Sequence, residues 1–497
     1  MSNNFDKADV VSTDIVPVEG YAEEKNGPHE FDDLYVDPVE DSKLTRTLDL
    51  RILPLATAMY FFSSLDRSNY SNAKTDGMTT DLHFPTDGYA IVLSIFYVFF
   101  SFCGIPAMIL TRYFGAHRTL PLFMLGFGSM SMINAAAPNL ASSIVIRTLL
   151  GVFESGFASS LIFYLTTFYK RDELARRIAC FYSCLALAGA FSGLLAYGVF
   201  GIDNETLHGW QYLFLIEGGA TVVAATASWF LLPKSAAEAK FLTPEQKVIA
   251  RKRLLMDSTQ EVDTQFNAKK FFSPLLETKF WLFALIAIGY GTASTVASNF
   301  LSIIIQRFKY SVVKTNLWTV APNFFSAICL GVSCYLSDRF RCRSWYLLSA
   351  LCMTCTGCII LACLPISAKV AGYFATFLIA GGAFTPSVLF HSWHQNNDVG
   401  LDSRGFRVAA LTAFANTGGL VSANIFLTRF APKYVIPLII TAVLEGMAIT
   451  IVLSLRLHWG RLNKKRNSEQ GVNWTSKDVP TEVLAAGPAD PRFRYFL

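Results

Sequence analysis

Arg147-Thr-Leu-Leu-Gly151-Val-Phe-Glu154-Ser-Gly156 places an arginine and a glutamate inside an apolar run that extends from about Leu140 to Phe168. This run is long enough to cross a bilayer, which takes about 20 helical residues. An ionised group at mid-membrane costs about 2.5–3.5 kcal/mol on insertion scales. Seven residues at about 100° each return almost to the starting direction with a rise of about 10 Å, so both charges face the same way, two turns apart. Each charge therefore needs a partner on another helix, in water or on a ligand.

Two interpretations of these charges remain open. In the first, Arg147 and Glu154 form a structural charge lock between helices. In the second, they line a polar cavity that handles an anion and a proton.

The composition indicates a helical membrane protein that crosses the bilayer many times. Of 497 residues, 52 % are hydrophobic and only 16 % are charged, whereas soluble domains have about 25 % charged residues. The net charge of +5 is modest and suggests no nucleic-acid partner. Cys352, Cys355 and Cys358 share one face of an apolar helix without a nearby His or carboxylate, so we expect packing residues there and no metal site.

The apolar runs predict an all-α membrane protein with twelve transmembrane helices in two six-helix pseudo-repeat bundles. The predicted spans are 51–71, 88–110, 118–137, 140–168, 178–200, 210–232, 280–305, 316–337, 344–364, 369–393, 405–427 and 433–457. The predicted organisation is a disordered acidic tail (1–42), a first bundle (43–232), a middle loop (233–278), a second bundle (279–460) and a polar tail (461–497). The middle loop begins a helix at Thr243-Pro244-Glu245-Gln246, with Thr243 and Gln246 forming a capping box. That helix is expected either on the inner leaflet or as a solvated charged helix.

Lysine and arginine are more frequent in the breaks after even-numbered spans, which places both termini in the cytosol. Asn204-Glu-Thr206 is then an acceptor for N-glycosylation on the outer side. The break from Gly104 to Arg118 and the break from Gly331 to Arg343 have the same form, a small residue at a helix end followed by a basic turn. Such an internal repeat is typical of secondary transporters. A cytosolic gate is expected at these two breaks, with the candidate residues Arg112, Arg118, Asp338 and Arg339.

The first span ends in Leu65-Asp66-Arg67-Ser68-Asn69, an adjacent pair of opposite charges. Neighbours on a helix diverge by about 100°, so the two side chains cannot both face one partner. In one arrangement Asp66 points toward Arg147 and Arg67 turns into the cavity; in the other, both charges snorkel to the outer interface. In the cavity arrangement an arginine fork binds a carboxylate, and a proton on Asp66 or Glu154 releases an arginine for that anion.

Other polar residues in the spans are weaker candidates. Glu217 and Glu445 are expected to be structural. Candidate residues for the substrate path are Asn299, Asn323, His391 and Asn416.

Several motifs together resemble one family. They are Leu65-Asp66-Arg67-Ser68-Asn69; Arg147 with Gly151, Glu154 and Gly156; Phe168-Tyr-Lys170-Arg171-Asp172-Glu173; Ala188-Gly189-Ala190-Phe191-Ser192-Gly193; Gly209-Trp210 with Glu217-Gly218; and Asn396-Asn397. The sequence between about 45 and 460 resembles the major facilitator superfamily, and within it the anion:cation symporters of the fungal allantoate permease group.

This resemblance implies two six-helix bundles, alternating access and proton-coupled uptake of organic anions. It implies that Asp66 and Glu154 take the protons and that Arg67 and Arg147 meet the substrate carboxylate. Thr111 stands where the superfamily often has Asp, so the charge lock is expected to be weaker in this half, while Asp338 retains it in the other. A proline that relatives often have after Gly156 is also lacking, so a different cavity shape is expected here.

We therefore expect a proton-coupled importer of a small organic carboxylate, such as nicotinate or pantothenate, and not an enzyme. The alternatives are an allantoate, ureidosuccinate or small-peptide permease and, in another class, a non-transporting nutrient receptor. No cofactor besides the coupled proton is expected. The expected partners are the small organic anion and membrane lipid, with the chain as a monomer. The plasma membrane is the expected location, with the endoplasmic reticulum or vacuole as alternatives.

Overall fold

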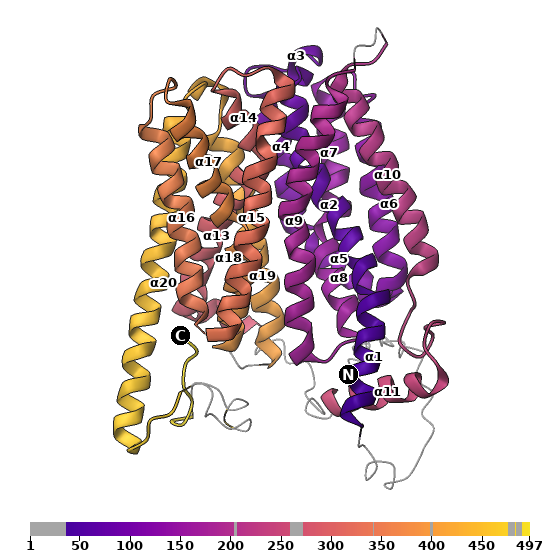
Figure 1. The fold of residues 1–497 in the computed structure, drawn as a ribbon, viewed down its shortest axis with the longest axis vertical. Helices are drawn as coiled ribbons and strands as arrows, with labels where there is room; N and C mark the ends of the chain where they lie inside the picture. The colour runs from indigo at the N-terminus through magenta and orange to yellow at the C-terminus, as the bar shows by residue number, and fades with distance from the viewer. Residues whose placement is uncertain are drawn as a thin grey trace, which may run out of the picture.

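The computed structural model describes residues 36–202, 206–258, 272–340, 342–397, 401–475, 483 and 490–497. Every regular element in these ranges is a helix. Figure 1 shows the helices standing side by side in two groups, the first half of the chain beside the second. The turn helix α3 (Met78–Asp81) lies at one end of the bundle, and α1 (Pro38–Arg51) with α11 (Pro244–Ser258) lies at the other. We call these the α3 end and the α1 end.

Each predicted span corresponds to one rod of the bundle. The first six rods are α2 (Leu53–Thr75), α4 (Gly88–Phe102) with α5 (Gly104–Phe114), α6 (Ala116–Asn134), α7 (Leu140–Ser155) with α8 (Phe157–Thr166), α9 (Arg171–Val199) and α10 (Gly209–Leu231). The second six are α13 (Thr278–Asn299) with α14 (Leu301–Gln306), α15 (Val312–Phe340), α16 (Arg343–Cys363), α17 (Lys369–Ala383) with α18 (Thr385–Asn396), α19 (Leu401–Ile425) and α20 (Val435–Gln470). The short helices η2 (Ser273–Leu276) and η3 (Thr428–Phe430) precede α13 and α20.

Within the described ranges, nine helices are long and apolar enough to cross a membrane, and the pair α4 and α5, bent by 46°, makes a tenth span. The two remaining rods, α2 and α6, carry more polar residues. Ser63, Asp66 and Asn69 of α2 are all buried. A membrane helix that protein surrounds can carry polar residues, because they face other helices and not lipid.

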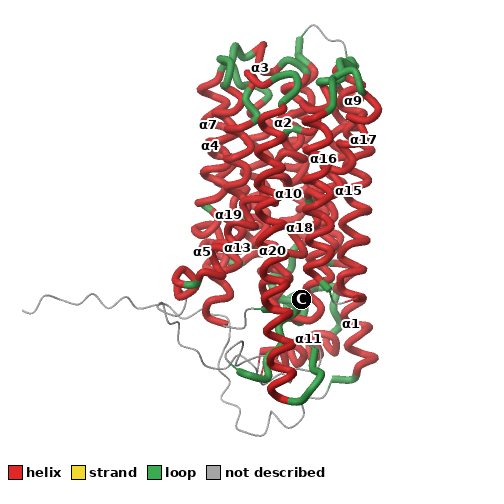
Figure 2. Tube along the Cα trace, turned by 90° about the vertical axis from the view of Figure 1, so that its left-hand side faces the viewer, coloured by secondary structure: helices red, strands yellow, loops and turns green. Residues whose placement is uncertain are grey.

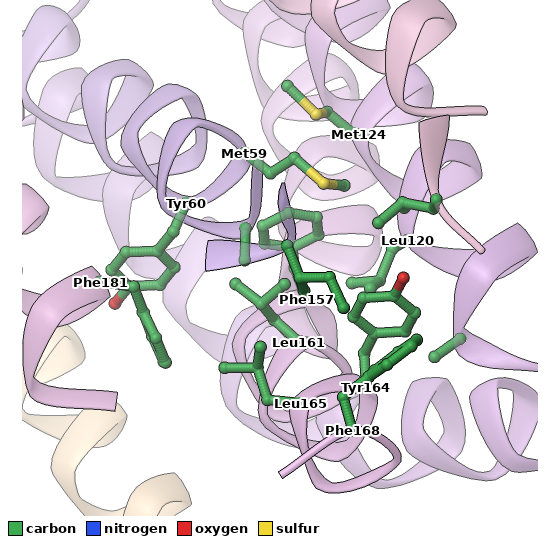
Figure 3. Close-up of a cluster of buried hydrophobic side chains, with 14 of the residues drawn as sticks. Met59, Tyr60, Leu120, Met124, Phe157, Leu161, Tyr164, Leu165, Phe168 and Phe181 are labelled. Atoms are coloured by element: carbon green, nitrogen blue, oxygen red, sulfur yellow. The ribbon is translucent and has the colours of Figure 1, made fainter. Parts of the chain in front are cut away.

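Apolar packing holds α2 against α6, α8 and α9 in the first half. The buried side chains of this cluster, drawn in Figure 3, include Met59, Tyr60, Leu120, Met124, Phe157, Leu161, Tyr164, Leu165, Phe168 and Phe181. Phe157 begins α8 directly after the break at Gly156. The cluster therefore fixes the position of α7's last turn, which carries Glu154, relative to α2.

Hydrogen bonds join the two halves near the α3 end. Ser302 donates to Ser71 (2.9 Å) and Asn316 donates to Thr75 (3.0 Å). Asn299 donates to the Tyr97 hydroxyl (2.5 Å). These contacts connect α13, α14 and α15 to α2 and α4, so the halves are closed against each other at this end.

Ion pairs tie three segments together at the α1 end of the first half. Arg253 of α11 is fully buried and pairs with Glu173 of α9 and with Asp41 of α1 (3.1 Å). Arg177 of α9 pairs with Asp49 of α1 (2.6 Å). These ion pairs dock α1 on α9 and α11. Because α1 begins at Pro38, the last residues of the predicted disordered tail are helical.

The predicted helix in the middle loop is confirmed. Thr243 and Gln246 each accept a hydrogen bond from the other's backbone N–H at 3.2 Å, which is the predicted capping box.

The last residues of the chain fold back onto the second half. Helix α20 continues to Gln470, beyond the predicted span end at 457, and residues 490–497 then lie along it at the α1 end (Figures 1 and 2). We call residues 490–497 the C-terminal strap. Asn463 and Asn397 each exchange two hydrogen bonds with strap backbone, at Tyr495 (2.9 and 2.9 Å) and at Phe496 (2.7 and 2.9 Å). The Tyr495 ring stacks on Trp459 with 5.1 Å between centroids.

Candidate functional site

Two ion pairs link α2 to α7 inside the first half. Arg147 Nη1 lies 3.1 Å from Asp66 Oδ2, and Arg67 Nε lies 2.8 Å from Glu154 Oε1. The predicted contact of Asp66 with Arg147 is confirmed. Arg67 pairs with Glu154, and its predicted turn into a cavity stays a prediction. The alternative in which Asp66 and Arg67 snorkel to the interface is wrong, because the Asp66 side chain is buried and Arg67 pairs with the buried Glu154.

The Asp66–Arg147 pair is almost completely buried. The two side chains are 5 % and 2 % exposed. Ser131 of α6 donates to Asp66 Oδ1 (2.7 Å), and the Arg147 guanidinium lies 3.9 Å from the centre of the Tyr70 ring. Asp66 is thus hydrogen-bonded through both oxygens.

The Arg67–Glu154 pair is more open, and on one side only. The Arg67 side chain is 17 % exposed, whereas that of Glu154 is 1 % exposed. Glu154 Oε1 also accepts from Ser63 (3.1 Å), while Glu154 Oε2 is buried without a hydrogen-bond partner among the described residues. Arg67 is therefore the accessible member of the four charges, and Glu154 has one oxygen free to carry a proton.

Buried ion pairs are poor stabilisers, because the cost of removing two charges from water offsets most of their attraction. Two such pairs side by side in a membrane protein are better explained by function, since ionisable residues within spans are usually functional. The geometry meets the requirements of both interpretations that the sequence left open, the structural lock and the polar cavity.

The residues predicted to line a substrate path lie in the second half, and some of them reach toward Arg67. Asn299 binds Tyr97, which interacts electrostatically with Arg67. His391 Nε2 lies 3.4 Å from the Tyr290 hydroxyl, and Tyr182 interacts with both Tyr290 and Arg67.

The other two predicted path residues are placed differently. Asn323 faces α9 at Gly189, where a Cβ atom would come within 3.0 Å of its side chain. Asn416 is half-buried on α19. No contact between either residue and Arg67 is found in the part of the chain that the structure describes.

The predicted gate residues are largely exposed. Arg112, Arg118 and Arg339 all face outward, and Asp338 pairs with Arg343 (3.6 Å) and not with Arg339. Thr111 is buried, and its hydroxyl forms a hydrogen bond with the Ser160 hydroxyl (2.6 Å). A neutral contact is therefore found at the position where relatives often have a charged residue. The predicted glycosylation acceptor Asn204 lies outside the described residues.

Three residues that the sequence did not single out complete the site. They are Ser63, Tyr70 and Ser131. The helical period contained a signal for two of them, since Ser63 lies four residues before Arg67 and Tyr70 lies four residues after Asp66, and such positions share a helix face. The role of Ser131 depends on a contact between distant spans, which no local pattern reveals.

A bundle of membrane-spanning helices in two matching halves, with paired charges buried inside one half, is typical of a membrane transport protein. The family model of the Major Facilitator Superfamily matches residues 56–423, and the chain belongs to this family. It is a membrane transporter and not an enzyme.

Three similar proteins come from fungi. The chain is 43 % identical over 450 residues to the MFS-type transporter efuF of Hormonema carpetanum, covering 90 % of this chain and 91 % of that one. It is 38 % identical over 470 residues to the major facilitator-type transporter hxnP of Emericella nidulans, covering 93 % and 95 %. It is 26 % identical over 458 residues to the high-affinity nicotinic acid transporter of Saccharomyces cerevisiae, covering 92 % and 85 %.

Among solved structures, a bacterial homologue of the human lysosomal transporter Spinster, in an inward-facing and occupied conformation, has the same fold. Its TM-score is 0.61 at 13 % identity, covering 81 % of this chain and 95 % of that one.

Proposed function

We propose that the protein is a proton-coupled symporter that imports a small organic carboxylate, with nicotinate and pantothenate as the first candidates. The observation that carries the proposal is the asymmetry of the Arg67–Glu154 pair. The cation is partly exposed, and its anion is buried with one oxygen unbonded among the described residues.

Arg67 is the proposed anion-binding group. A guanidinium holds a carboxylate through two parallel hydrogen bonds, and it binds in this way better than an ammonium does. The aromatic ring of Phe100 lies 5.2 Å from the Arg67 Cζ, and Tyr97 is also near. An arginine among aromatic rings suits a flat aromatic acid such as nicotinate. Arg147 is the second proposed anion-binding group, and it becomes available only when Asp66 releases it.

Glu154 and Asp66 are the proposed proton-coupling residues. A proton on Glu154 cancels its charge, weakens its hold on Arg67 and leaves the arginine for the substrate anion. Anion and proton then occupy the site together, and alternating access carries both across. The asparagines and the histidine of the second half, Asn299, Asn323, Asn416 and His391, are proposed to complete the path.

The relatives support this choice of substrate class, since one of them is named a nicotinic acid transporter. The proposal includes a cytosolic location for the α1 end, from the distribution of lysine and arginine, and the plasma membrane as the site of uptake.

The test is uptake of labelled nicotinate and pantothenate into liposomes that contain the purified full-length protein, with an acidic and a neutral outer pH. We expect accumulation that acid increases and a protonophore abolishes. Arg67→Lys keeps the charge but loses the fork, and we expect it to raise the KM at least tenfold. Arg51→Lys, at an exposed arginine of α1, is the matched control.

If uptake does not depend on the pH gradient, proton coupling is refuted. Binding without uptake would instead identify a receptor. Uptake of allantoate, ureidosuccinate or a dipeptide in place of both vitamins would overturn the choice of substrate.

A further inference from the structure

Glu217 is a third buried carboxyl beside the Asp66–Arg147 pair. It lies on α10, is 2 % exposed, and both of its carboxyl oxygens are buried without a hydrogen-bond partner among the described residues. Asp66 from α2 and Arg147 from α7 are the charged groups that interact with it.

The packing of α10 on α6 and α2 places Glu217 at the level of this pair. At Gly218, α10 is so close to α6 that a Cβ atom would come within 2.8 Å of the Gly128 carbonyl oxygen and 2.6 Å of the Met132 nitrogen. Ser131, which donates to Asp66, lies between these two residues of α6. One turn along α10, the Phe214 ring lies 5.9 Å from the Arg147 guanidinium.

The charges in this region do not balance if every group is ionised. Arg147 faces two carboxyls, and its Nη1 already binds Asp66. An ionised carboxylate that is buried without a donor is costly, and such a group takes up a proton instead. Asp66 has donors on both oxygens, from Arg147 and Ser131, whereas Glu217 has none among the described residues.

We propose that Glu217 holds a proton in this conformation and exchanges it with Asp66, so that Glu217 and Asp66 form a carboxyl pair that shares Arg147. The O–H bond at Glu217 breaks and an O–H bond forms at Asp66, with no other atom transferred. Asp66 becomes neutral and releases Arg147, and the carboxylate now on Glu217 becomes its partner. Nε and Nη2 of Arg147 have no hydrogen-bond partner among the described residues, so both can turn to Glu217.

This inference rests on the proposed proton coupling and adds a residue to it. From the sequence we expect a structural role for Glu217, and a structural role predicts that a neutral amide in its place changes folding but not coupling. Glu445 of α20 provides a matched control, because it is also a buried glutamate (1 % exposed) but lies in the other half, on a helix away from Arg147.

The first experiment measures nicotinate accumulation in liposomes with the membrane potential held at zero. Each coupled proton adds about a factor of ten in accumulation for each pH unit of gradient. We expect the Glu217→Gln variant to accumulate about tenfold less nicotinate than the wild type for each pH unit of gradient. The variant should still exchange labelled for unlabelled nicotinate. Glu217→Asp should keep part of the coupling, and Glu445→Gln should match the wild type. Equal accumulation by Glu217→Gln and wild type would overturn the inference.

The second experiment needs no substrate and no transport. Infrared spectra of the purified protein at neutral pH should contain the carbonyl band of a protonated carboxyl, and Glu217→Gln should lose part of this band. An unchanged band overturns the inference. If wild-type accumulation does not depend on pH but Glu217→Gln still loses part of the band, the proposed proton coupling is refuted. The protonation of Glu217 is then still supported.

Discussion

Replacing Arg147 with methionine should destabilise the protein by about 3–5 kcal/mol, because it strands the charge of Asp66 in a buried site. The two side chains are 2 % and 5 % exposed and their charged atoms lie 3.1 Å apart. At an effective dielectric constant of about 20, two charges at that distance attract by about 5 kcal/mol. The loss of the guanidinium from the Tyr70 ring adds about 0.5–2 kcal/mol.

The double variant Asp66→Asn with Arg147→Met should recover most of this loss. A buried pair replaced by neutral groups of similar size is often as stable as the original, whereas a pair with one member removed is not. The asparagine can still accept the hydrogen bond from Ser131. We therefore expect a coupling energy of several kcal/mol in the double-mutant cycle.

The assay is denaturant unfolding of the purified variants in detergent micelles, followed by tryptophan fluorescence. Lys43→Met is the control, since its pair with Glu40 has a similar distance (2.9 Å) but side chains 64 % and 44 % exposed. Exposed pairs contribute about 0–1 kcal/mol. A double variant as unstable as Arg147→Met alone would refute the reasoning, because the loss would then come from packing and not from the stranded charge.

Three further predictions concern other parts of the molecule. Burial raises the pKa of Asp76, between α2 and α3, from 3.8 to about 6, so its ionisation costs stability as the pH rises through that range. The Asp76→Asn variant should therefore be more stable than the wild type above pH 6 and equally stable near pH 3, which thermal unfolding at each pH measures. Unfolding midpoints that change with pH in the same way for both proteins would contradict this. Gly193→Ala should open the α3 end, since its Cβ would come within 2.8 Å of the Asn316 carbonyl oxygen, while Gly198→Ala has free space. Spin-label distances between the halves should lengthen for the first variant only. The Asn397→Ala variant loses both hydrogen bonds to Phe496, each worth about 0.5–1.5 kcal/mol. The amide hydrogens of the strap should then exchange about 10- to 100-fold faster, whereas the control Asn396→Ala should leave their exchange rate unchanged.

The spans could be predicted from the sequence, because they depend on local composition. The pairing of Asp66 with Arg147 was one of two arrangements that the sequence left open, since it joins two distant spans. Apolar runs of about 20 residues mark spans directly. The 100° between neighbouring residues means that Asp66 and Arg67 must serve different partners. Even so, the apolar content of α2 falls short of a typical span, and only its burial in the bundle explains why it crosses the membrane.

The parts that the sequence did not predict depend on contacts between distant segments. Ser131 reaches Asp66 from another span, and Arg253 enters a charge cluster made by α1 and α9. Asp338, a predicted gate residue, pairs with Arg343 of the next helix, a partner that the sequence did not specify. Charge spacing along the chain cannot choose between such neighbours, since the choice depends on how the helices end.

The C-terminal strap is held in part by its own peptide groups. Asn397 and Asn463 bind the N–H and C=O of Phe496 and Tyr495, as an adjoining β-strand would, and the bonds do not depend on which side chains the strap carries. Substitutions along the strap are therefore tolerated at these bonds as long as the residue is not proline, which lacks the N–H. The two asparagines have less latitude, because only an amide side chain presents a carbonyl acceptor beside an NH₂ donor, and glutamine, the other such residue, is one methylene longer.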